Sequence, residues 1–202
     1  MIKNFETSKS KRPYPKYIPL LQLQENVVKL NRKVVCDIGN RFLAVEAAID
    51  DIKEVTTQKF YMMDRTDGAS GSSSLLKPSK DHPHFIEQEV EVKSHSLEHL
   101  LDKVDWERFK YIEHIKTDCE GKDFDVVKSI GKYLSKIVFI TSEMSNNLHH
   151  WHGSSDPQAF VDFMIQSGFV VIHHGNGEIV FFNKALEQEA YRDRLDFITL
   201  GL

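Results

Sequence analysis

From about Tyr111 onward, short apolar runs alternate with segments in which apolar residues recur every three or four positions. Continuous apolar runs such as 137–140 are typical of strands buried on both faces, and the second pattern indicates amphipathic helices. Alternating strands and helices favour βαβ units, whose strands pair in parallel. The sequence therefore predicts an α/β fold with a mostly parallel sheet.

The same patterns, together with turn and capping residues, locate the individual elements. Ser96 and Asp156 are expected N-caps, and Pro157 occupies the favoured first position of its helix. Asn176-Gly177 is the signature of a two-residue hairpin turn, so the sheet should end in an antiparallel hairpin. We expect helices over 20–30, 96–103, 123–134 and 156–166, a helix or tail over 186–195, strands over 42–49, 56–62, 89–92, 111–116, 136–141, 169–173 and 178–182, and a long loop over 64–83.

Length and composition limit the domain count and the partners. A chain of 202 residues, 41% of them hydrophobic, suits a single domain over 1–202, with residues 1–13 as a flexible leader. The net charge of -4 gives no general attraction for nucleic acid or for an anionic membrane. No apolar run approaches the roughly 18 residues of a membrane span. Two cysteines and the lack of an apolar signal segment favour a reduced, cytoplasmic setting.

The most informative segment is the expected strand end at residues 117–121. An apolar strand runs into Asp118 and Glu120, a glycine follows, and a helix then begins. In an open α/β sheet the ligand crevice lies at the carboxyl ends of the strands, so these carboxylates are candidates for chemistry. The alternative interpretation is that Asp118 and Asp123 only cap the helix that follows.

Several segments resemble the FkbM family of methyltransferases. Residues 115–128 are similar to the family's hallmark, which reads roughly K-I-D-V-E-G-x-E-x-x-V-L-K. Glu143, after an apolar strand, resembles the acidic residue at the family's next strand end. Further similar segments occur in the family's order at 15–26, 47–51, 71–76, 96–101 and 179–183, so the resemblance covers about residues 13–183.

The resemblance implies a Rossmann-like sheet that carries S-adenosyl-L-methionine-dependent O-methylation of a hydroxyl, with a carbohydrate as the first choice of acceptor. One of four side chains would be the base that accepts the hydroxyl proton. The implied catalytic residues are Asp118, Glu120, Glu143 and His149, and the implied donor contacts are Ala48, Ile49, Asp50, Ser73, Ser74 and Asp118.

The chain also departs from the family at its start. The family's glycine-rich turn, D-x-G-A-N-x-G, and the acidic residue of its second strand are not found. Asp37 and Gly39 are the nearest match, but Glu46 follows too soon for a helix between a glycine turn and its acidic partner. We therefore expect the N-terminal strand-helix unit to be missing: either lost by truncation, supplied by a preceding domain, or degenerate. The expected partners are such a preceding domain or a second copy of the chain in a homo-oligomer. The 202 residues alone should bind the donor weakly or not at all.

The cluster His149-His150-Trp151-His152 is the other conspicuous feature. A metal site needs ligands that converge on one point, which adjacent histidines on a loop rarely do, so no metal is expected. Substrate contact is the functional interpretation: Trp151 would stack on a sugar face, and His149 or His152 would take a hydroxyl proton. The alternative is a solvated loop with one packed tryptophan. For the whole chain, the alternative function is a non-catalytic Rossmann-like binding or interaction module that has lost donor binding.

Overall fold

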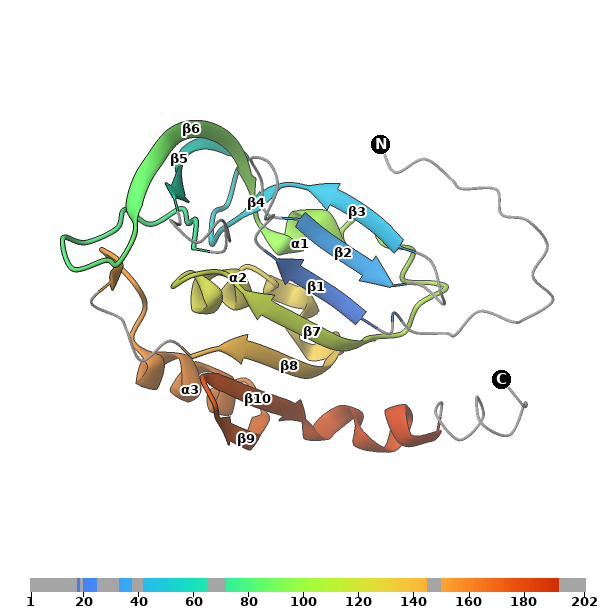
Figure 1. The fold of residues 1–202 in the computed structure, drawn as a ribbon. Helices are drawn as coiled ribbons and strands as arrows, with labels where there is room; N and C mark the ends of the chain where they lie inside the picture. Colours follow the sequence, from blue (N-terminus) through green and yellow to red (C-terminus); the bar gives the residue numbers. More distant parts are fainter. Residues whose placement is uncertain are drawn as a thin grey trace.

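The computed structural model describes residues 18, 20–24, 33–37, 42–64, 72–144 and 150–192. They form two β-sheets and several short helices, so the fold is mixed α/β, as predicted (Figure 1). The strands are β1 (Leu20–Gln24), β2 (Lys33–Asp37), β3 (Phe42–Glu46), β4 (Ala48–Ile49), β5 (Thr56–Asp64), β6 (Phe85–His95), β7 (Ile112–Asp118), β8 (Ile137–Glu143), β9 (Phe169–Gly175) and β10 (Glu178–Asn183). The helices are α1 (Leu97–Leu101), α2 (Asp123–Lys128) and α3 (Pro157–Gln166), with 3-10 helices η1 (Gly131–Lys136) and η3 (Lys184–Leu186).

The larger sheet has seven strands in the order β3-β2-β1-β7-β8-β10-β9. Only its centre is parallel, because β7 pairs in parallel with β1 and with β8. The pairs β1–β2, β2–β3, β8–β10 and β9–β10 are all antiparallel. The prediction of a mostly parallel sheet is therefore wrong, and the sheet is mixed. The reason lies in the first three strands, which follow one another through short connections, and such connections suit antiparallel pairing.

The smaller sheet has the order β4-β6-β5 and lies beside the carboxyl end of β7 (Figure 1). Strand β6 pairs in parallel with β4 and in antiparallel fashion with β5. It is much longer than the predicted strand over 89–92. This sheet brings the segment after β5 to the functional edge of the larger sheet, as described below.

Local sequence signals account well for the elements of the second half. The side chain of Ser96 accepts a hydrogen bond from the His99 backbone, and that of Asp156 accepts one from Gln158, so both predicted N-caps are confirmed. The C-terminal antiparallel hairpin is also confirmed. Its turn residues Asn176 and Gly177 have φ of 54° and 79°, as a two-residue turn of the primed type requires.

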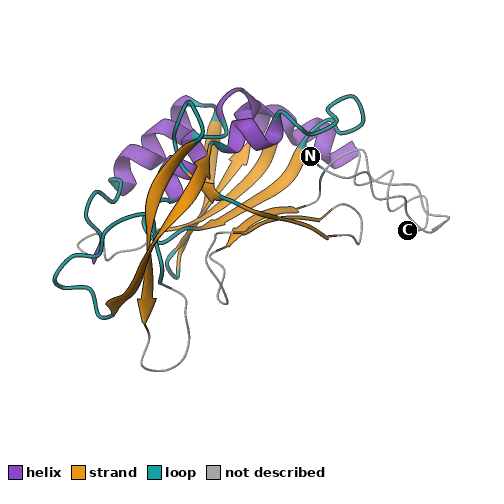
Figure 2. Ribbon diagram, turned by 90° about the horizontal axis from the view of Figure 1, so that it is seen from above, coloured by secondary structure: helices purple, strands orange, loops and turns teal. Residues whose placement is uncertain are grey.

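Helices α1, α2 and α3 lie on one side of the seven-stranded sheet (Figure 2). Their apolar side chains form one cluster with the inward-facing residues of the strands. Members of this cluster that are fully buried include Leu97, Val126, Ile115, Ile140 and Phe181. The burial of this apolar face is the main stabilising contribution to the sheet-helix layer. Among the described residues, no helix is long and apolar enough to cross a membrane.

Two predicted helices differ from the structure. The helix expected over 20–30 is wrong for residues 20–24, which form strand β1, while 25–30 lie outside the described residues. The helical spacing of Leu20 and Leu23 is outweighed there by pairing on both sides, with β2 and with β7. The helix expected over 123–134 is divided into α2 and the 3-10 helix η1. The predicted leader, residues 1–13, also lies outside the described residues.

Candidate functional site

A tight turn follows strand β7 and shapes the candidate site. The Lys122 backbone N–H donates to the Cys119 carbonyl across 3.2 Å, which closes a four-residue turn. The two central residues, Glu120 and Gly121, have positive φ values of 49° and 86°. This is the pattern of a type I′ turn, in which a glycine is unstrained and a glutamate is unusual. The strand therefore ends in a sharp reversal that leads directly into α2.

The segment after β5 packs against this turn. The Ser74 hydroxyl donates a 2.9 Å hydrogen bond to the Glu120 carbonyl. At Gly121, an added Cβ would lie 3.1 Å from both Leu76 Cδ1 and Trp151 Cδ1, so these two side chains already cover the glycine. The turn is held from the outside by residues that are distant in the sequence.

The turn and strand β8 bring together the carboxylates of Asp118, Glu120 and Glu143. One oxygen from each residue lies within 4.8 Å of the others, and all three side chains are half-buried. We call this cluster the acidic edge. These three carboxylates meet where β7 and β8 end, and Ser74, from the segment after β5, reaches the same place.

One lysine lies beside the acidic edge. Lys116, two residues before Asp118 on β7, places its Nζ 2.8 Å from Glu178 Oε1 on β10. Glu178 is also the cross-strand partner of Glu143. The hydrogen bond to Glu178 and the nearby charges of Asp118 and Glu143 keep the pKa of Lys116 above its usual value, so it stays charged. Its charge is shared with Glu178, and the acidic edge keeps an excess of negative charge.

Burial and like charge act together on Glu143. Burial is the main cause that raises the pKa of this carboxyl from 4.5 to about 7, and the negative charges of Asp118 and Asp123 raise it further. A carboxyl with such a pKa exchanges protons near neutral pH. It therefore has the property of a general base or acid.

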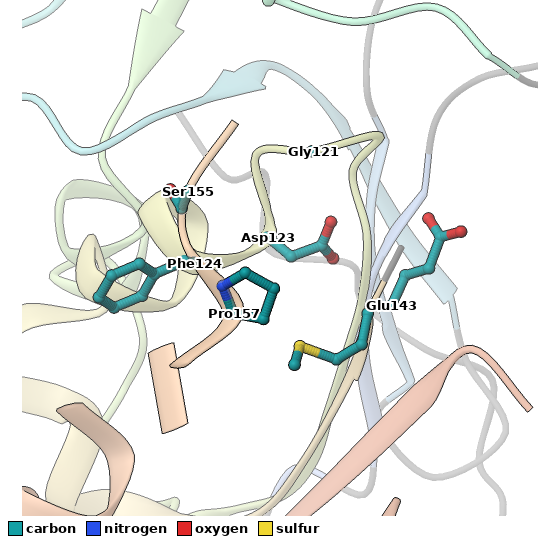
Figure 3. Close-up of a pocket in the computed structure, with 7 residues that line it drawn as sticks. Gly121, Asp123, Phe124, Glu143, Ser155 and Pro157 are labelled. Carbon is teal, nitrogen blue, oxygen red and sulfur yellow. The ribbon is translucent and has the colours of Figure 1, made fainter. Parts of the chain in front are cut away.

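A small pocket lies nearby and is lined in part by Glu143, whose carboxylate points away from the side chains of Phe124, Ser155 and Pro157 (Figure 3). It holds about 30 Å³ of space, about a tenth of the lower end of the usual volume range for pockets that bind a small organic ligand. The lining residues are Gly121, Asp123, Phe124, Glu143, Met144, Ser155 and Pro157. The part of the pocket formed by described residues can therefore admit a hydroxyl group, but not a whole nucleotide.

The acidic edge is also the only group of described residues whose ligand atoms are close enough together to share a cation. Carboxylate oxygens are the ligands that Mg²⁺ and Ca²⁺ prefer. Carboxylates also gather without any ion, and no independent feature at this edge points to one. We assign no metal ion here.

On the other side of the turn, the expected donor contacts are already used within the protein. Ala48 and Ile49 are buried. One carboxylate oxygen of Asp50 lies 2.5 Å from Lys122 Nζ, and the other accepts a hydrogen bond from Gln58. Lys122 continues the contact to Asp125, which pairs with Lys128, which in turn pairs with Asp51. We call Asp50, Lys122, Asp125, Lys128 and Asp51 the ion-pair chain.

Ser73 and Ser74, which were predicted to contact the donor, form hydrogen bonds within the protein. Ser73 is buried, and its hydroxyl accepts a hydrogen bond from the Met63 backbone. Ser74 is fully buried, and its hydroxyl both donates to Glu120 and accepts from Leu76. Both hydroxyls therefore position the protein's own backbone. Donor binding by either serine stays a prediction without structural support.

The histidine-rich segment is packed more tightly than expected. Trp151 is only 5% exposed, and its ring lies 4.5 Å from that of His82 and against Gly121. The structure thus favours the interpretation of one packed tryptophan over an open platform for a sugar. His152 is exposed, while its backbone N–H donates to Lys77. His149 lies outside the described residues.

Sequence reasoning missed several contributors to this site. Lys122 was not predicted to contribute. The signal in the sequence is a lysine directly after the Glu-Gly turn, close to four acidic residues: Asp118, Glu120, Asp123 and Asp125. Lys116 and Glu178 are 62 positions apart, so only the strand order β7-β8-β10 brings them together. Comparison of the chain with protein-family models, curated proteins and solved structures found no match. The function is therefore inferred from the geometry and the motifs of this chain.

Proposed function

We propose that this chain forms the acceptor side of an S-adenosylmethionine-dependent O-methyltransferase of the FkbM type, with a Rossmann-like sheet and a carbohydrate hydroxyl as acceptor. The observation that carries the proposal is Glu143, whose pKa of about 7 arises beside Asp118 and Glu120. This cluster lies at the carboxyl ends of two parallel strands, where open α/β sheets bind their ligands. A base with a pKa near the working pH suits proton removal from a hydroxyl.

The donor itself does not fit the described residues. Asp50, Ser73 and Ser74 have protein partners for their polar side-chain atoms. No step is therefore derived through S-adenosylmethionine, and the proposal concerns the acceptor side. We expect a calorimetric titration of the chain with S-adenosylhomocysteine to show binding weaker than micromolar, which a high donor concentration offsets in a transfer assay. Micromolar binding would contradict this interpretation.

On the acceptor side, the three carboxylates of the acidic edge would have different roles. Ionised Glu143 would accept the proton of an acceptor hydroxyl that binds at the acidic edge. Asp118 and Glu120 would accept hydrogen bonds from neighbouring hydroxyls and so orient the sugar. Because the pKa of Glu143 is about 7, the base is available above pH 7 and is lost by protonation below it.

The proposal is tested by supplying the chain with methyl-labelled S-adenosylmethionine at high concentration and a panel of sugars. We expect label on a hydroxyl oxygen, with the rate reduced roughly 10²- to 10⁴-fold in Glu143→Gln, the range expected for loss of a general base. Glu113→Gln is the matched control, because Glu113 is also half-buried but lies at the start of β7. No transfer by the wild-type chain, or equal transfer by Glu143→Gln, would contradict the proposal.

A second candidate function is favoured by the contact between Lys122 and Asp50. This buried pair occupies the place where the motif resemblance puts a donor contact, as expected of a non-catalytic binding module. Such a module would bind a sugar at the acidic edge without transferring a methyl group. Sugar binding that is weakened in Glu143→Gln, together with no label transfer, would support this second function over the first.

A further inference from the structure

Ser74 connects the smaller sheet to the acidic edge. Its backbone forms two hydrogen bonds with Tyr61 on β5, with N···O distances of 2.8 and 3.1 Å. Strand β5 therefore fixes the position of this residue. Ser74 is the point at which the segment after β5 reaches the turn that follows β7.

The orientation of the Ser74 hydroxyl is fully determined. It donates to the Glu120 carbonyl across 2.9 Å and accepts from the Leu76 backbone N–H across 3.1 Å. The residue is 0% exposed, so water does not compete for either bond. A buried hydroxyl with both roles occupied acts as a rigid link between two pieces of backbone.

The carbonyl that receives this bond belongs to the one unusual residue of the turn. Glu120 has a φ of 49°, a left-handed conformation that residues other than glycine, asparagine and aspartate rarely adopt. Such conformations persist where the surrounding structure enforces them, often at functional sites. In this conformation the Glu120 carboxylate lies within 4.8 Å of those of Asp118 and Glu143.

We propose that Ser74 is a positioning residue for the acidic edge: by holding the Glu120 carbonyl, it keeps the Glu120 carboxylate beside Asp118 and Glu143. The effect of this positioning on turnover rests on the proposed methyltransferase function. The positioning of the Glu120 carboxylate does not depend on that function. The smaller sheet thereby acts as a support for the site on the larger sheet.

Ser73 supplies a matched control. It is the neighbouring residue, it is also buried, and its hydroxyl also makes a hydrogen bond to backbone, but its partner is Met63 on β5. Ser73→Ala and Ser74→Ala therefore remove the same group from the same segment. Only the second change breaks the link to the turn.

The test uses NMR of the full chain carrying each variant. In Ser74→Ala we expect the HN–Hα coupling and the Cα and Cβ shifts of Glu120 to leave their left-handed values. Ser73→Ala should leave these signals as in wild type. Unchanged Glu120 signals in Ser74→Ala, or equal changes in both variants, would overturn the proposal.

Two further measurements keep the outcome decisive. If Ser74→Ala does not fold, Ser74→Cys, which keeps the volume but donates weakly, should show the same shifts in smaller degree. In the methyl-transfer assay, Ser74→Ala should lower kcat by about ten- to a hundredfold through misplacement of the site. NMR changes without any wild-type transfer would refute the proposed function and leave the positioning role intact. Wild-type transfer with unchanged Glu120 signals in Ser74→Ala would refute the positioning role and leave the proposed function intact.

Discussion

Two groups of carboxylates flank the same turn, and they differ in whether lysine side chains neutralise them. In the ion-pair chain, Asp50 and Asp125 each contact Lys122, and Lys128 completes the contacts to Asp51 and Asp125. In the acidic edge, three carboxylates lie within 4.8 Å of one another, and Lys116, two residues before Asp118 on β7, is paired with Glu178. One side of the turn is neutralised and the other keeps its like charges together.

The pKa shifts follow this difference. Burial alone would raise the pKa of Asp125, but the hydrogen bonds from Lys122 and Lys128 lower it overall. Burial also raises the pKa of Glu143, and there the neighbouring carboxylates add to the increase. A neutralised cluster contributes to stability, whereas a like-charge cluster is costly to fold and is typical of sites that carry chemistry. Because of this difference in charge, we assign a structural role to the ion-pair chain and a functional role to the acidic edge.

Removing the central cation of the ion-pair chain should have the largest effect. Lys122→Met leaves the buried Asp50 carboxylate without its cation, which costs about 3–5 kcal/mol in other buried pairs, and leaves the half-buried Asp125 with Lys128 alone. The free energy of unfolding in urea measures this loss. Lys132→Met is the control, because Lys132 pairs with Asp102 at an exposed site, and its loss should be far smaller. Similar losses of stability in the two variants would mean that the ion-pair chain does not stabilise the fold.

The turn between the two groups is the next place to test. Gly121→Ala should cost about 2–3 kcal/mol, because the new Cβ adds contacts of 3.1 Å with Leu76 and Trp151 to the strain of a φ of 86°. Gly177→Ala should cost only about 1 kcal/mol, because its φ of 79° is similar but nothing lies within 4 Å. Thermal or urea unfolding gives both values. Equal costs would show that Leu76 and Trp151 do not constrain the turn.

The two sides of the turn also differ in how far the sequence predicts them. Asp118, Glu120 and Glu143 could be grouped in advance, because each lies at or just after the end of a strand and parallel strands end at one edge. The ion-pair chain could not, because the contact between Asp50 and Lys122 depends on how the end of β4 meets the start of α2. For the same reason Asp50 was predicted to contact a donor, whereas its carboxylate is occupied by the protein.

Among the elements, local chemistry decides what is predictable. The Asn176-Gly177 turn and the caps Ser96 and Asp156 act through neighbouring backbone, so the sequence predicts them correctly. Strand β1 depends on pairing with β2 and β7, which the helical spacing of its leucines does not reveal. Tertiary pairing here outweighs local pattern.

Neutralising Glu143 should stabilise the fold in a pH-dependent way. The folded protein holds this proton up to about pH 7, whereas an unfolded glutamate releases it near 4.5. The stabilisation from protonation is therefore fully present below pH 4.5 and is lost as pH rises through 7. Glu143→Gln should be more stable than wild type by about 1–2 kcal/mol at pH 8, after discounting for partial exposure, and equally stable at pH 4. A difference that does not vary with pH would contradict the assigned charge state.

The smallest expected effect concerns the lysine beside the acidic edge. Glu178→Gln removes one negative charge near Glu143 and frees Lys116 from its 2.8 Å partner. Both changes favour ionised Glu143, so its titration midpoint should fall, by roughly half a unit. Lys116→Met should move the midpoint in the opposite direction. Carboxyl NMR follows both variants, and shifts of the same sign would refute this account of the charges.

The most direct test of the contrast between the two groups is the titration of Glu143 in the wild-type protein. Carboxyl-labelled glutamate allows its ionisation to be followed by NMR, and Glu143→Gln assigns the signal. The structure predicts a midpoint of about 7, because burial and the charges of Asp118 and Asp123 oppose ionisation. A midpoint near 4.5 would show an ordinary solvated carboxyl, and Glu143 would then have no claim to the role of base.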